Sequence, residues 1–564
     1  MSVLGKNWNI RNQDNSQSII EKILANRGLV GRNKVDSFLK LSFKKGMHNP
    51  FLMKGMDKAI QRIKQALKNN ERIMIFGDYD VDGISGTAIM VHALKLLGGK
   101  VSYRLPHRVE DGYGLSNKFI DEFAGLNIKV LITVDCGISC KDQIALAKQK
   151  GIDVIITDHH MIPEHIPDKA FAILHPQQPG CEYPFKGLTG AGVSYKLACA
   201  LITELCEAAD RENYLYALLD LASLGTVADL GPLVDENRII VKYGLQSLQS
   251  TKWQGLEYLK EIAGIEPNSK ININTIGFCI GPRINAAGRI DNPYYALQLL
   301  LYDKRDEKAK MIAAHLENLN QTRQKMVADA LEELENRIKD DQDSNSIIIA
   351  WDKNWHVGIL GLLAAKCVEK HNAPTIIMQD FGDELVGSSR GPEWFDLVEA
   401  LTAHSHLLKA FGGHTQAAGF TVEKKNLNEF TKSMHEYARE KLEHTEWHPT
   451  IEIDCELSDK EIDDGLVNFL EQMEPFGIGN EQPIFLLRNV SIDDVKKVGK
   501  DQNHLHFKVQ TPTRTLSVIG FRLGKHESYL RDHNAIDLVC YLERNEWKGM
   551  SKLQLRAIDL KGVE

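Results

Sequence analysis

Short apolar runs alternate with segments of helical periodicity over about the first 300 residues. The runs RIMIF (72–76), KVLITV (129–134) and DVIIT (153–157) are rich in Ile and Val and lack period-two alternation. Such runs are typical of strands buried on both faces of a parallel sheet. The segments GTAIMVHALKLLG and KDQIALAKQKG have apolar residues at i, i+3 and i+4 and end at Gly, as crossover helices do. The pattern predicts an α/β fold.

The pattern changes twice more along the chain. Residues 303–343 contain no Gly or Pro, which predicts one long helix, either packed on one domain or connecting two lobes. A second α/β pattern begins after it with SIIIAW (346–351), which favours the connector. Beyond about residue 446, alternating strands separated by turns predict a small antiparallel barrel. We expect five parts: an N-terminal helical segment (1–45), a first α/β domain (46–302), the connecting helix (303–343), a second α/β domain (344–445) and the barrel (446–564).

Composition narrows the class of protein. The chain has 564 residues, 43% of them apolar and 26% charged, as in ordinary globular proteins. Its net charge is −8, so nucleic acid would bind in a local basic groove rather than over the whole surface. Nine cysteines without a CxxC pair, and the absence of a long apolar run, lead us to expect a soluble protein of a reducing, cytoplasmic compartment.

Acidic residues and histidines follow the three buried strands at the points where these strands end. Because ligands bind outside the carboxyl ends of strands in an open parallel sheet, we expect these side chains to share one rim. Taken strand by strand, they are Asp78, Asp80 and Asp82; Asp135; and Asp158, His159 and His160.

So much negative charge in one place is unstable unless cations neutralise it. Carboxylates combined with imidazoles suit Mn²⁺ or Mg²⁺. A carboxylate between two others can bridge two metal ions, which is the arrangement that activates water for phosphoryl displacement. Any single Asp here is more often a helix cap or turn residue, but the three acidic segments together favour a metal site.

One further carboxylate is a candidate ligand. Asp220 lies on a predicted helix beside Leu219 and Leu221, where an unpaired carboxylate would be costly to bury and a metal would remove that cost. Asp229 could serve in the same way, but its place in the turn GTVAD favours a capping role. We therefore expect Asp220 to be the ligand.

Four segments resemble, in order, the motifs of the DHH phosphoesterase superfamily: GDYDVDG, VDCG, TDHH and LDLASLGTVAD. Others resemble the RecJ family within it, among them PHRVEDGYGL (106–115), IGPRINAAGR (280–289), FGGHTQAAGF (411–420) and EPFGIGNEQPIF (474–485). The similarity extends over about residues 50–560. It implies two α/β lobes, the DHH and DHH-associated domains, joined by the long helix around a catalytic cleft, and a C-terminal OB-fold barrel for nucleic acid.

The resemblance implies a 5′→3′ exonuclease that degrades single-stranded DNA to 5′-mononucleotides with two Mn²⁺ or Mg²⁺ ions. It implies a role in recombinational and mismatch repair at the bacterial nucleoid, with single-strand-binding protein and a RecQ-type helicase as partners. We expect a monomer. Two other functions are possible within the superfamily. The first is a hydrolase of small nucleotides, but such an enzyme would need neither the additional segments nor the barrel. The second is a catalytically inactive scaffold, but a scaffold would lack the metal ligands. A preference for RNA stays open, because 2′-OH discrimination depends on close contacts.

The resemblance also implies roles for individual residues. Asp135 would bridge the two ions, and His160 would face the scissile phosphate. Asp78 would support the ligands or bind a metal directly. The implied metal ligands are Asp80, Asp82, Asp135, His159 and Asp220.

Candidate phosphate-binding residues lie in both lobes. Guanidinium groups offer paired donors to phosphate oxygens, so Arg283 and Arg289 are natural phosphate clamps, with a structural salt bridge as the alternative for each. The segment that contains both also contains Asn285. By resemblance, a terminal 5′-phosphate would bind Arg108, Ser389 and Arg390, and a further phosphate would bind His414 of GGH.

The barrel segment is locally basic. Residues 491–525 contain seven Lys or Arg against three Asp. Basic grooves with aromatic faces are the usual way in which OB folds bind single strands. Phe507, Phe521 and Trp547 could stack on bases, and Phe507 and Phe521 could equally lie in the barrel core.

Overall fold

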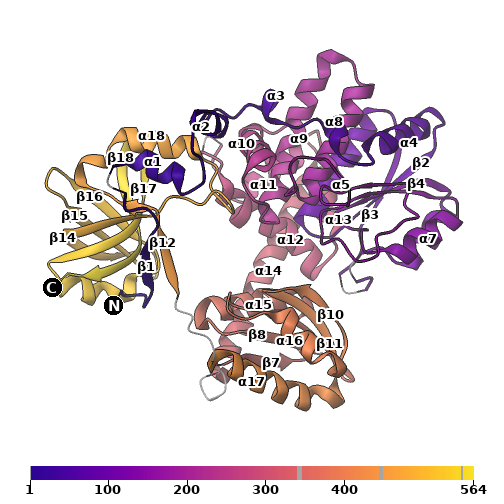
Figure 1. The fold of residues 1–564 in the computed structure, drawn as a ribbon. Coiled ribbons are helices and arrows are strands. Elements are labelled where there is room, and N and C mark those ends of the chain that lie inside the picture. Colours follow the sequence, from indigo (N-terminus) through magenta and orange to yellow (C-terminus); the bar gives the residue numbers. More distant parts are fainter. Residues whose placement is uncertain are drawn as a thin grey trace. The chain divides into compact units, whose positions relative to one another are not determined.

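The computed structural model describes residues 2–14, 16–108, 110–112, 114–267, 269–338, 346–443, 449–547 and 550–563. The chain forms two compact units, each of which is contiguous in space but not in sequence (Figure 1). The larger unit comprises Lys45–Gly231 and Asp235–Glu446, and the smaller unit comprises Met1–Lys44, Pro232–Val234 and Trp447–Glu564.

A five-stranded, fully parallel sheet is the core of the first lobe of the larger unit. The apolar runs found in the sequence form its central strands, which are buried along nearly their whole length. The strands, in spatial order, are β3 (Lys100–Arg104), β2 (Arg72–Gly77), β4 (Ile128–Val134), β5 (Asp153–Thr157) and β6 (Ala172–Leu174).

Helices connect and cover these strands. The most deeply buried is α5, which begins directly after β2 and packs on β2, α8 and α9. Its Gly, Ser, Thr and Ala residues permit this close approach from several sides. The helices of this lobe are α4 (Met56–Lys68), α5 (Val81–Leu96), α6 (Asn117–Gly125), α7 (Lys141–Gln149), α8 (Gly190–Leu205), α9 (Ala208–Ala228), α10 (Asp235–Gln249), α11 (Gln254–Ile262), the π-helix η2 (Thr275–Ile280), α12 (Gly281–Ile290) and α13 (Tyr294–Leu300).

The long helix α14 (Glu307–Ile338) leads from the first lobe to the second. It packs on α11, α12 and α13 of the first lobe and on α15 of the second. One stripe of apolar residues, including Leu316, Val327 and Leu334, makes these contacts, while the opposite face is charged. A helix of this length therefore serves as a packed connector rather than a free-standing rod.

The second lobe is a five-stranded mixed sheet with helices. Only β7 and β8 are parallel, and the other neighbouring strands are antiparallel. The strands, in spatial order, are β10 (Leu408–His414), β11 (Ala417–Glu423), β9 (Glu384–Arg390), β8 (Thr375–Asp380) and β7 (Ile348–Asp352). The helices are α15 (Val357–His371), α16 (Leu397–Ala403) and α17 (Leu427–Glu443).

The smaller unit is built on a closed five-stranded barrel. Its strands run in the order β14, β15, β16, β18 and β17, and pairing of β17 with β14 closes the ring. Two α/β lobes, a long connecting helix and a C-terminal barrel confirm the predicted fold class. The elements of the barrel region are β12 (Thr450–Ile453), β13 (Cys455–Glu456), α18 (Asp464–Met473), β14 (Phe485–Val498), β15 (His504–Gln510), β16 (Thr515–Gly520), α19 (Glu527–Arg531), β17 (Ala535–Trp547) and β18 (Met550–Gly562).

The N-terminal segment belongs to this same unit. It begins with a strand, β1 (Asn7–Ile10), which the sequence did not predict and which pairs in parallel with β12. Helix α1 (Ile19–Ala25) places Ile19, Ile23 and Leu24 in the core of the barrel, and α2 (Arg32–Leu39) follows. Residues from the two ends of the chain, more than 400 positions apart in the sequence, therefore share one hydrophobic core.

Candidate active site

The carboxyl ends of β2, β4 and β5 bring the predicted acidic residues and histidines together. Asp80 is the N-cap of α5, and its side chain accepts a hydrogen bond from Gly83 N (3.0 Å). Three groups of side chains each place their ligand atoms within 4.8 Å of one another. These groups are Asp78, Asp80 and Asp135; Asp82, His159 and Asp229; and Asp135, His159 and His160.

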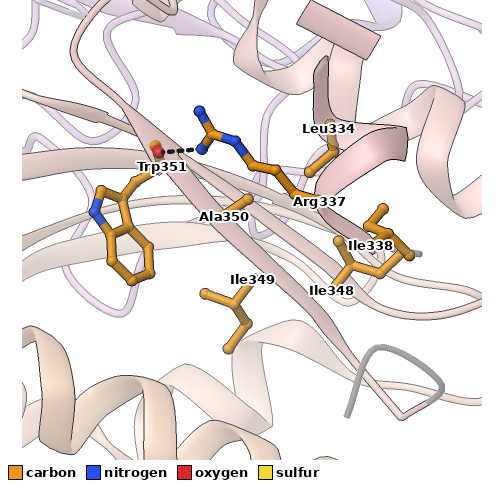
Figure 2. A pocket seen from close by; sticks show the side chains of 7 residues that line it. All are labelled: Leu334, Arg337, Ile338, Ile348, Ile349, Ala350 and Trp351. Atoms are coloured by element: carbon orange, nitrogen blue, oxygen red, sulfur yellow. Dashed lines mark hydrogen bonds between the residues drawn. The ribbon is translucent and has the colours of Figure 1, made fainter. Parts of the chain in front are cut away.

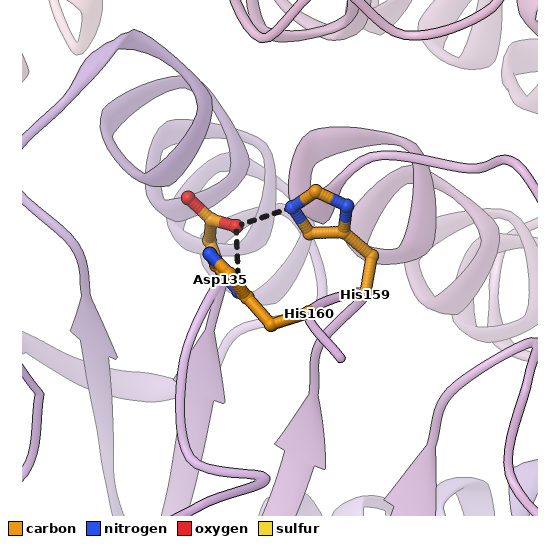
Figure 3. A group of neighbouring side chains, drawn as sticks. All are labelled: Asp135, His159 and His160. Carbon is orange, nitrogen blue, oxygen red and sulfur yellow. Dashed lines mark ion pairs between the residues drawn. The ribbon is translucent and has the colours of Figure 1, made fainter. Parts of the chain in front are cut away.

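Asp135 lies at the centre of this cluster. Its Oδ1 atom is 3.1 Å from His159 Nε2 and 3.8 Å from His160 Nδ1 (Figure 3). Its backbone has φ of 60°, a left-handed conformation that costs a non-glycine residue about 1 kcal/mol. A hydrogen bond from Asp135 N to Thr157 O (2.9 Å) holds the end of β4 against β5 in this conformation. Gly190 leaves room for the carboxylate, since a Cβ there would lie 2.5 Å from Asp135 Oδ1.

The buried carboxylates of Asp78 and Asp135 each have one oxygen that accepts no hydrogen bond within the described part of the chain. Asp78 Oδ1 and Asp135 Oδ1 are buried and accept no hydrogen bond from any described residue. Burial, with the nearby charge of Asp80, raises the pKa of Asp78 to about 8. Burial and the charges of the neighbouring carboxylates, with Asp82 first, raise the pKa of Asp135 well above its usual value. Unsatisfied buried carboxylate oxygens at this density fit one or more bound cations.

Asp82 differs from its neighbours because the protein already satisfies it. Its carboxylate accepts hydrogen bonds from the Thr189 hydroxyl (3.0 Å), Gly190 N (2.6 Å) and Ala191 N (2.9 Å) at the first turn of α8. This is a favourable position for an anion, because a helix N-terminus is electropositive. Asp82 thus anchors α8 to the rim as well as lying among the possible ligands.

Asp220 does not lie in this cluster, contrary to the prediction. Its carboxylate is fully buried and accepts hydrogen bonds from Thr251 Oγ1 (2.5 Å), Trp253 Nε1 (2.9 Å) and Leu221 N (2.8 Å). We expected a metal to offset the cost of its burial, but these three donors do so instead. Burial raises the pKa of Asp220 to about 7 despite them.

The structure instead places Asp229 beside the histidine. Asp229 caps the C-terminus of α9, and its Oδ2 lies 3.6 Å from His159 Nε2. Burial and the charges of Asp82 and Asp80 raise the pKa of Asp229 to about 8. The capping position expected from the turn is correct, but it does not exclude metal binding. Asp229 follows Asp220 by nine positions, which is two and a half helical turns, so the two carboxylates lie in different surroundings.

The two histidines of the DHH segment have opposite electrostatic environments. Burial lowers the pKa of His159, which favours the neutral imidazole that ligates metals. Burial acts in the same direction on His160, but the hydrogen bond from His160 Nδ1 to Asp158 (2.8 Å) outweighs it, and the pKa rises to about 9. The backbone of His160 is also held in place, because His175 Nε2 lies 2.8 Å from the His160 carbonyl oxygen. The other ring nitrogen of His175, Nδ1, accepts a hydrogen bond from Gln177 N.

The predicted phosphate-binding residues divide into paired and unpaired groups. Arg283 forms an ion pair with Glu317 (2.5 Å), so the structural alternative holds for it. Arg289 instead donates to the Gly358 carbonyl at the contact of the two lobes (3.1 Å). The guanidinium of Arg108 lies over the ring of Tyr79, 4.2 Å from its centroid.

The remaining predicted contacts lie on α12 and in the second lobe. Asn285 is half-buried on α12. Arg390 donates to the Ser389 carbonyl (2.7 Å), while the buried Ser389 hydroxyl donates to Ala418 O (3.1 Å) within the sheet. His414 is exposed at the end of the outer strand β10. The hydroxyl of Ser389 is thus already used in the sheet, whereas His414 is accessible.

The barrel's predicted basic residues are largely paired. Lys496 and Lys508 both contact Asp494, and Lys497 contacts Glu527. Phe507 is fully buried in the barrel core, whereas Phe521 is 54% exposed and packs edge-on against His504. Phe521 is therefore available for stacking and Phe507 is not, while the side chain of Trp547 lies outside the part that the structure describes.

A cavity of about 320 Å³ lies elsewhere in the larger unit, beside the outer strand β7 (Figure 2). Apolar side chains of β7 and of the end of α14 line most of it, and Arg337 donates to the Trp351 carbonyl (2.9 Å) across it. None of the predicted site residues lines it.

Among the helices described here, none is long and apolar enough to cross a membrane.

Family models match three segments of the chain, and known proteins match nearly all of it. The models described as DHH family N-terminal domain, DHHA1 domain and RecJ OB domain match residues 72–226, 344–440 and 453–559. The single-stranded-DNA-specific exonuclease RecJ of Bacillus subtilis is 35% identical, over 96% of this chain and 67% of that protein. The RecJ of Dickeya dadantii is 34% identical, over 96% of each chain.

Solved structures agree with these matches. The crystal structure of RecJ in complex with Mn²⁺ from Thermus thermophilus matches with a TM-score of 0.81 and 28% identity, over 97% of this chain and 76% of that chain. A crystal structure of exonuclease RecJ bound to manganese matches with a TM-score of 0.61 and 32% identity, over 70% of this chain and 97% of that chain. With its acidic rim, two lobes and barrel, the chain belongs to the RecJ family of single-stranded-DNA-specific exonucleases, within the DHH phosphoesterases.

Proposed function

We propose that this protein degrades single-stranded DNA from its 5′ end and releases 5′-mononucleotides by hydrolysis at a site that holds two Mn²⁺ or Mg²⁺ ions. The observation that carries this proposal is the cluster of carboxylates at the ends of β2 and β4, where the buried oxygens Asp78 Oδ1 and Asp135 Oδ1 accept no hydrogen bond from any described residue. RecJ structures that contain Mn²⁺ and Mg²⁺ support the choice of ions.

The three side-chain groups suggest how the ligands divide. One ion would be held by Asp78, Asp80 and Asp135, and the other by Asp82, His159 and Asp229, with Asp135 close to both. Asp78 thereby becomes a ligand in this proposal, and Asp229 replaces Asp220. Bound ions of this kind polarise a phosphodiester and lower the pKa of a bound water.

The protein's own side chains would orient the substrate and supply a proton. His160, with its pKa raised to about 9, is protonated at neutral pH and can give its Nε2 proton to the departing 3′-oxygen. Asp158 holds the other ring nitrogen, and this fixes the ring plane. Arg108, Arg289 and Arg390, with Asn285 and His414, would bind phosphates of the strand. Ser389 would assist through its backbone, because its hydroxyl is occupied.

Digestion of end-labelled DNA tests the proposal. With Mn²⁺, a 5′-labelled single strand should lose its label at once as mononucleotide, while a 3′-labelled strand should retain it until late. Duplex DNA, RNA and a cyclic dinucleotide serve as alternative substrates, and D135A serves as the inactive control. Hydrolysis of the cyclic dinucleotide alone would move the protein to the small-substrate branch of the superfamily. If neither wild type nor D135A hydrolyses any of these substrates although metal is bound, the protein is a scaffold rather than an enzyme.

The wider role follows from this activity. We propose that the protein acts in the bacterial cytoplasm, in recombinational and mismatch repair, where single strands are exposed. A single-strand-binding protein and a RecQ-type helicase would supply such strands, and the protein would act as a monomer.

A further inference from the structure

Four arginines from four different elements come together where the two lobes meet. They are Arg108 after β3, Arg289 on α12, Arg323 on α14 and Arg390 on β9. Burial, and then the positive charges of Arg108, Arg323 and Arg390, lower the pKa of Arg289 to about 9. Cations are rarely gathered in this way without anions between them, because each destabilises the charge of the others.

None of these four guanidinium groups forms an ion pair with a carboxylate of the described residues. Their hydrogen bonds go to neutral oxygens instead: Arg289 donates to Gly358 O (3.1 Å), Arg390 to Ser389 O (2.7 Å) and Arg323 to the side-chain oxygen of Asn320 (2.9 Å). Such bonds orient a guanidinium group without neutralising its charge.

Two of the four also contain an unsatisfied donor. Arg108 Nε and Arg323 Nε are both buried, and neither has a hydrogen-bond partner in the part of the chain that the structure describes. A buried N–H group of a cation is costly to leave without an acceptor. Each of these two guanidinium groups therefore has room for an acceptor, and a phosphate offers several acceptor oxygens.

Other arginines on α12 and α14 show that this arrangement is particular to the four. Arg283 on α12 pairs with Glu317 of α14. Arg337, on the same helix as Arg323, pairs with both Glu333 and Asp352. Arg289, by contrast, has no such ion pair among the described residues, and the charge of Asp80 at the acidic rim acts on it.

We propose that Arg323 of the connecting helix is a further phosphate-binding residue, which acts with Arg289 on the substrate strand and is oriented by the buried Asn320. This inference rests on the proposed function. It gives α14 a part in binding DNA beyond joining the two lobes. Arg323 could not be identified from the sequence, because an arginine in a long polar helix has the same local pattern as an arginine that is exposed to solvent.

The phosphate could be the terminal monoester or an internal diester, since both present the same oxygens. Binding without catalysis distinguishes the two. A decathymidylate with a 3′ fluorophore, either 5′-phosphorylated or 5′-hydroxyl, is titrated with the full-length protein in EDTA and followed by fluorescence anisotropy. R323Q is compared with wild type and with R337Q, which removes a paired arginine from the same helix.

We expect R323Q to bind the phosphorylated strand about tenfold more weakly than wild type does, which is the usual effect of losing one charge-assisted contact. R337Q should bind as wild type does. A loss confined to the phosphorylated strand identifies the terminal phosphate, and an equal loss for both strands identifies an internal one. If R323Q binds both strands with wild-type affinity, the proposal is overturned.

Two further measurements separate other causes of failure. If R323Q does not fold, R323M takes its place, because an unbranched apolar side chain suits a half-buried position. Digestion of single-stranded DNA by wild type with Mn²⁺ is measured in parallel. If wild type digests no DNA, the proposed function fails. Stabilisation of wild type but not of R323M by inorganic phosphate, in a thermal unfolding assay, then still decides whether the arginines form an anion site.

Discussion

At the scale of single residues, burial of a carboxylate does not by itself indicate a metal. Asp220 and Asp135 are both buried carboxylates, yet only Asp135 retains an acceptor atom without a donor. Three donors surround Asp220, including the indole of Trp253, which lies 33 residues away in the sequence. Asp82 also has three donors, but it lies among other possible ligands, whereas Asp220 does not. The donors and the neighbouring ligand groups together decide the role of a buried carboxylate, and neither can be read from apolar neighbours in the sequence.

Substitution of the two candidate aspartates tests this distinction. D229N should lower Mn²⁺ affinity or Mn²⁺-dependent activity by on the order of a hundredfold, because it removes a charged ligand. D220N should stay near wild type, since an amide oxygen still accepts from Trp253 and Leu221 and the amide nitrogen can donate to the Thr251 hydroxyl. Mn²⁺ titration followed by calorimetry measures both. A D220N protein that folds but no longer binds Mn²⁺ would restore Asp220 as a ligand.

The pH dependence of stability has one clear residue-level source in His92. This side chain is buried, stacks on Trp253 and has its Nε2 3.0 Å from Leu300 O; burial lowers its pKa to about 4. The unfolded chain binds a proton near pH 6.5 but the folded chain does not, so stability is lost as pH falls from about 6.5 to 4. The loss amounts to about 3 kcal/mol.

Comparison with H92Q isolates this contribution. The free energy of unfolding of wild type, measured with urea between pH 7 and pH 4, should fall by about 3 kcal/mol more than that of H92Q. If the free energies of unfolding of the two proteins fell equally between pH 7 and pH 4, His92 would be protonated in the folded state as it is in the unfolded chain, and the prediction would be wrong.

At the scale of elements, close backbone contact holds the two lobes of the larger unit together. Gly358, at the start of α15, meets the carbonyl of Arg289 at the end of α12, where a Cβ would lie 1.9 Å from the oxygen. The Arg289 side chain donates back to the Gly358 carbonyl. Because both partners are backbone, neither can move aside without shifting a helix.

G358A should therefore disturb the contact between the lobes. We expect a loss of about 1–3 kcal/mol in the free energy of unfolding, together with weaker binding of phosphorylated DNA, since Arg289 lies at this contact. G125A is the matched control, because nothing lies within 4 Å of a Cβ at that helical position. Thermal unfolding and anisotropy measure the two effects. Equal behaviour of G358A and G125A would show that α15 can move away without cost.

At the scale of the whole molecule, the barrel unit is assembled from both ends of the chain. Trp8 Nε1 donates to Asp559 (3.0 Å), and β1 pairs with β12 from Asn7 to Ile10. Ile19, Ile23 and Leu24 fill part of the barrel core, and each stabilises it by about 1.5–3 kcal/mol. The N-terminal segment is therefore part of the barrel's fold rather than a preface to the first lobe.

Deletion of residues 1–44 should unfold or strongly destabilise the barrel unit while leaving the larger unit folded. Scanning calorimetry should show loss of one transition, and Mn²⁺ binding should persist because all its proposed ligands lie in the larger unit. Affinity for long single strands should fall if the barrel binds DNA. A shortened protein with both transitions intact would contradict this account.

Local sequence was sufficient to predict the three central strands of the first sheet and the acidic residues that follow them. A buried parallel strand needs only a short continuous apolar run, and its carboxyl end is marked by the next polar residues, so the sequence predicts Asp78, Asp135 and His159 on one rim. The long helix and the barrel followed from patterns of the same short range. The fold class was predictable because burial and periodicity are recorded residue by residue.

Contacts between distant residues were decided only by the tertiary structure. The pairing of Arg283 with Glu317, the missing partner of Arg323, the donors around Asp220 and the strand formed by Asn7–Ile10 all depend on segments far apart in sequence. The local sequence pattern around a charged side chain is the same whether that side chain forms an ion pair or lies without a counter-charge. The sequence alone determined which strand-end groups line the rim, because they follow apolar runs directly. The packing of the whole chain added Asp229, excluded Asp220 and determined which groups are left for metal and phosphate.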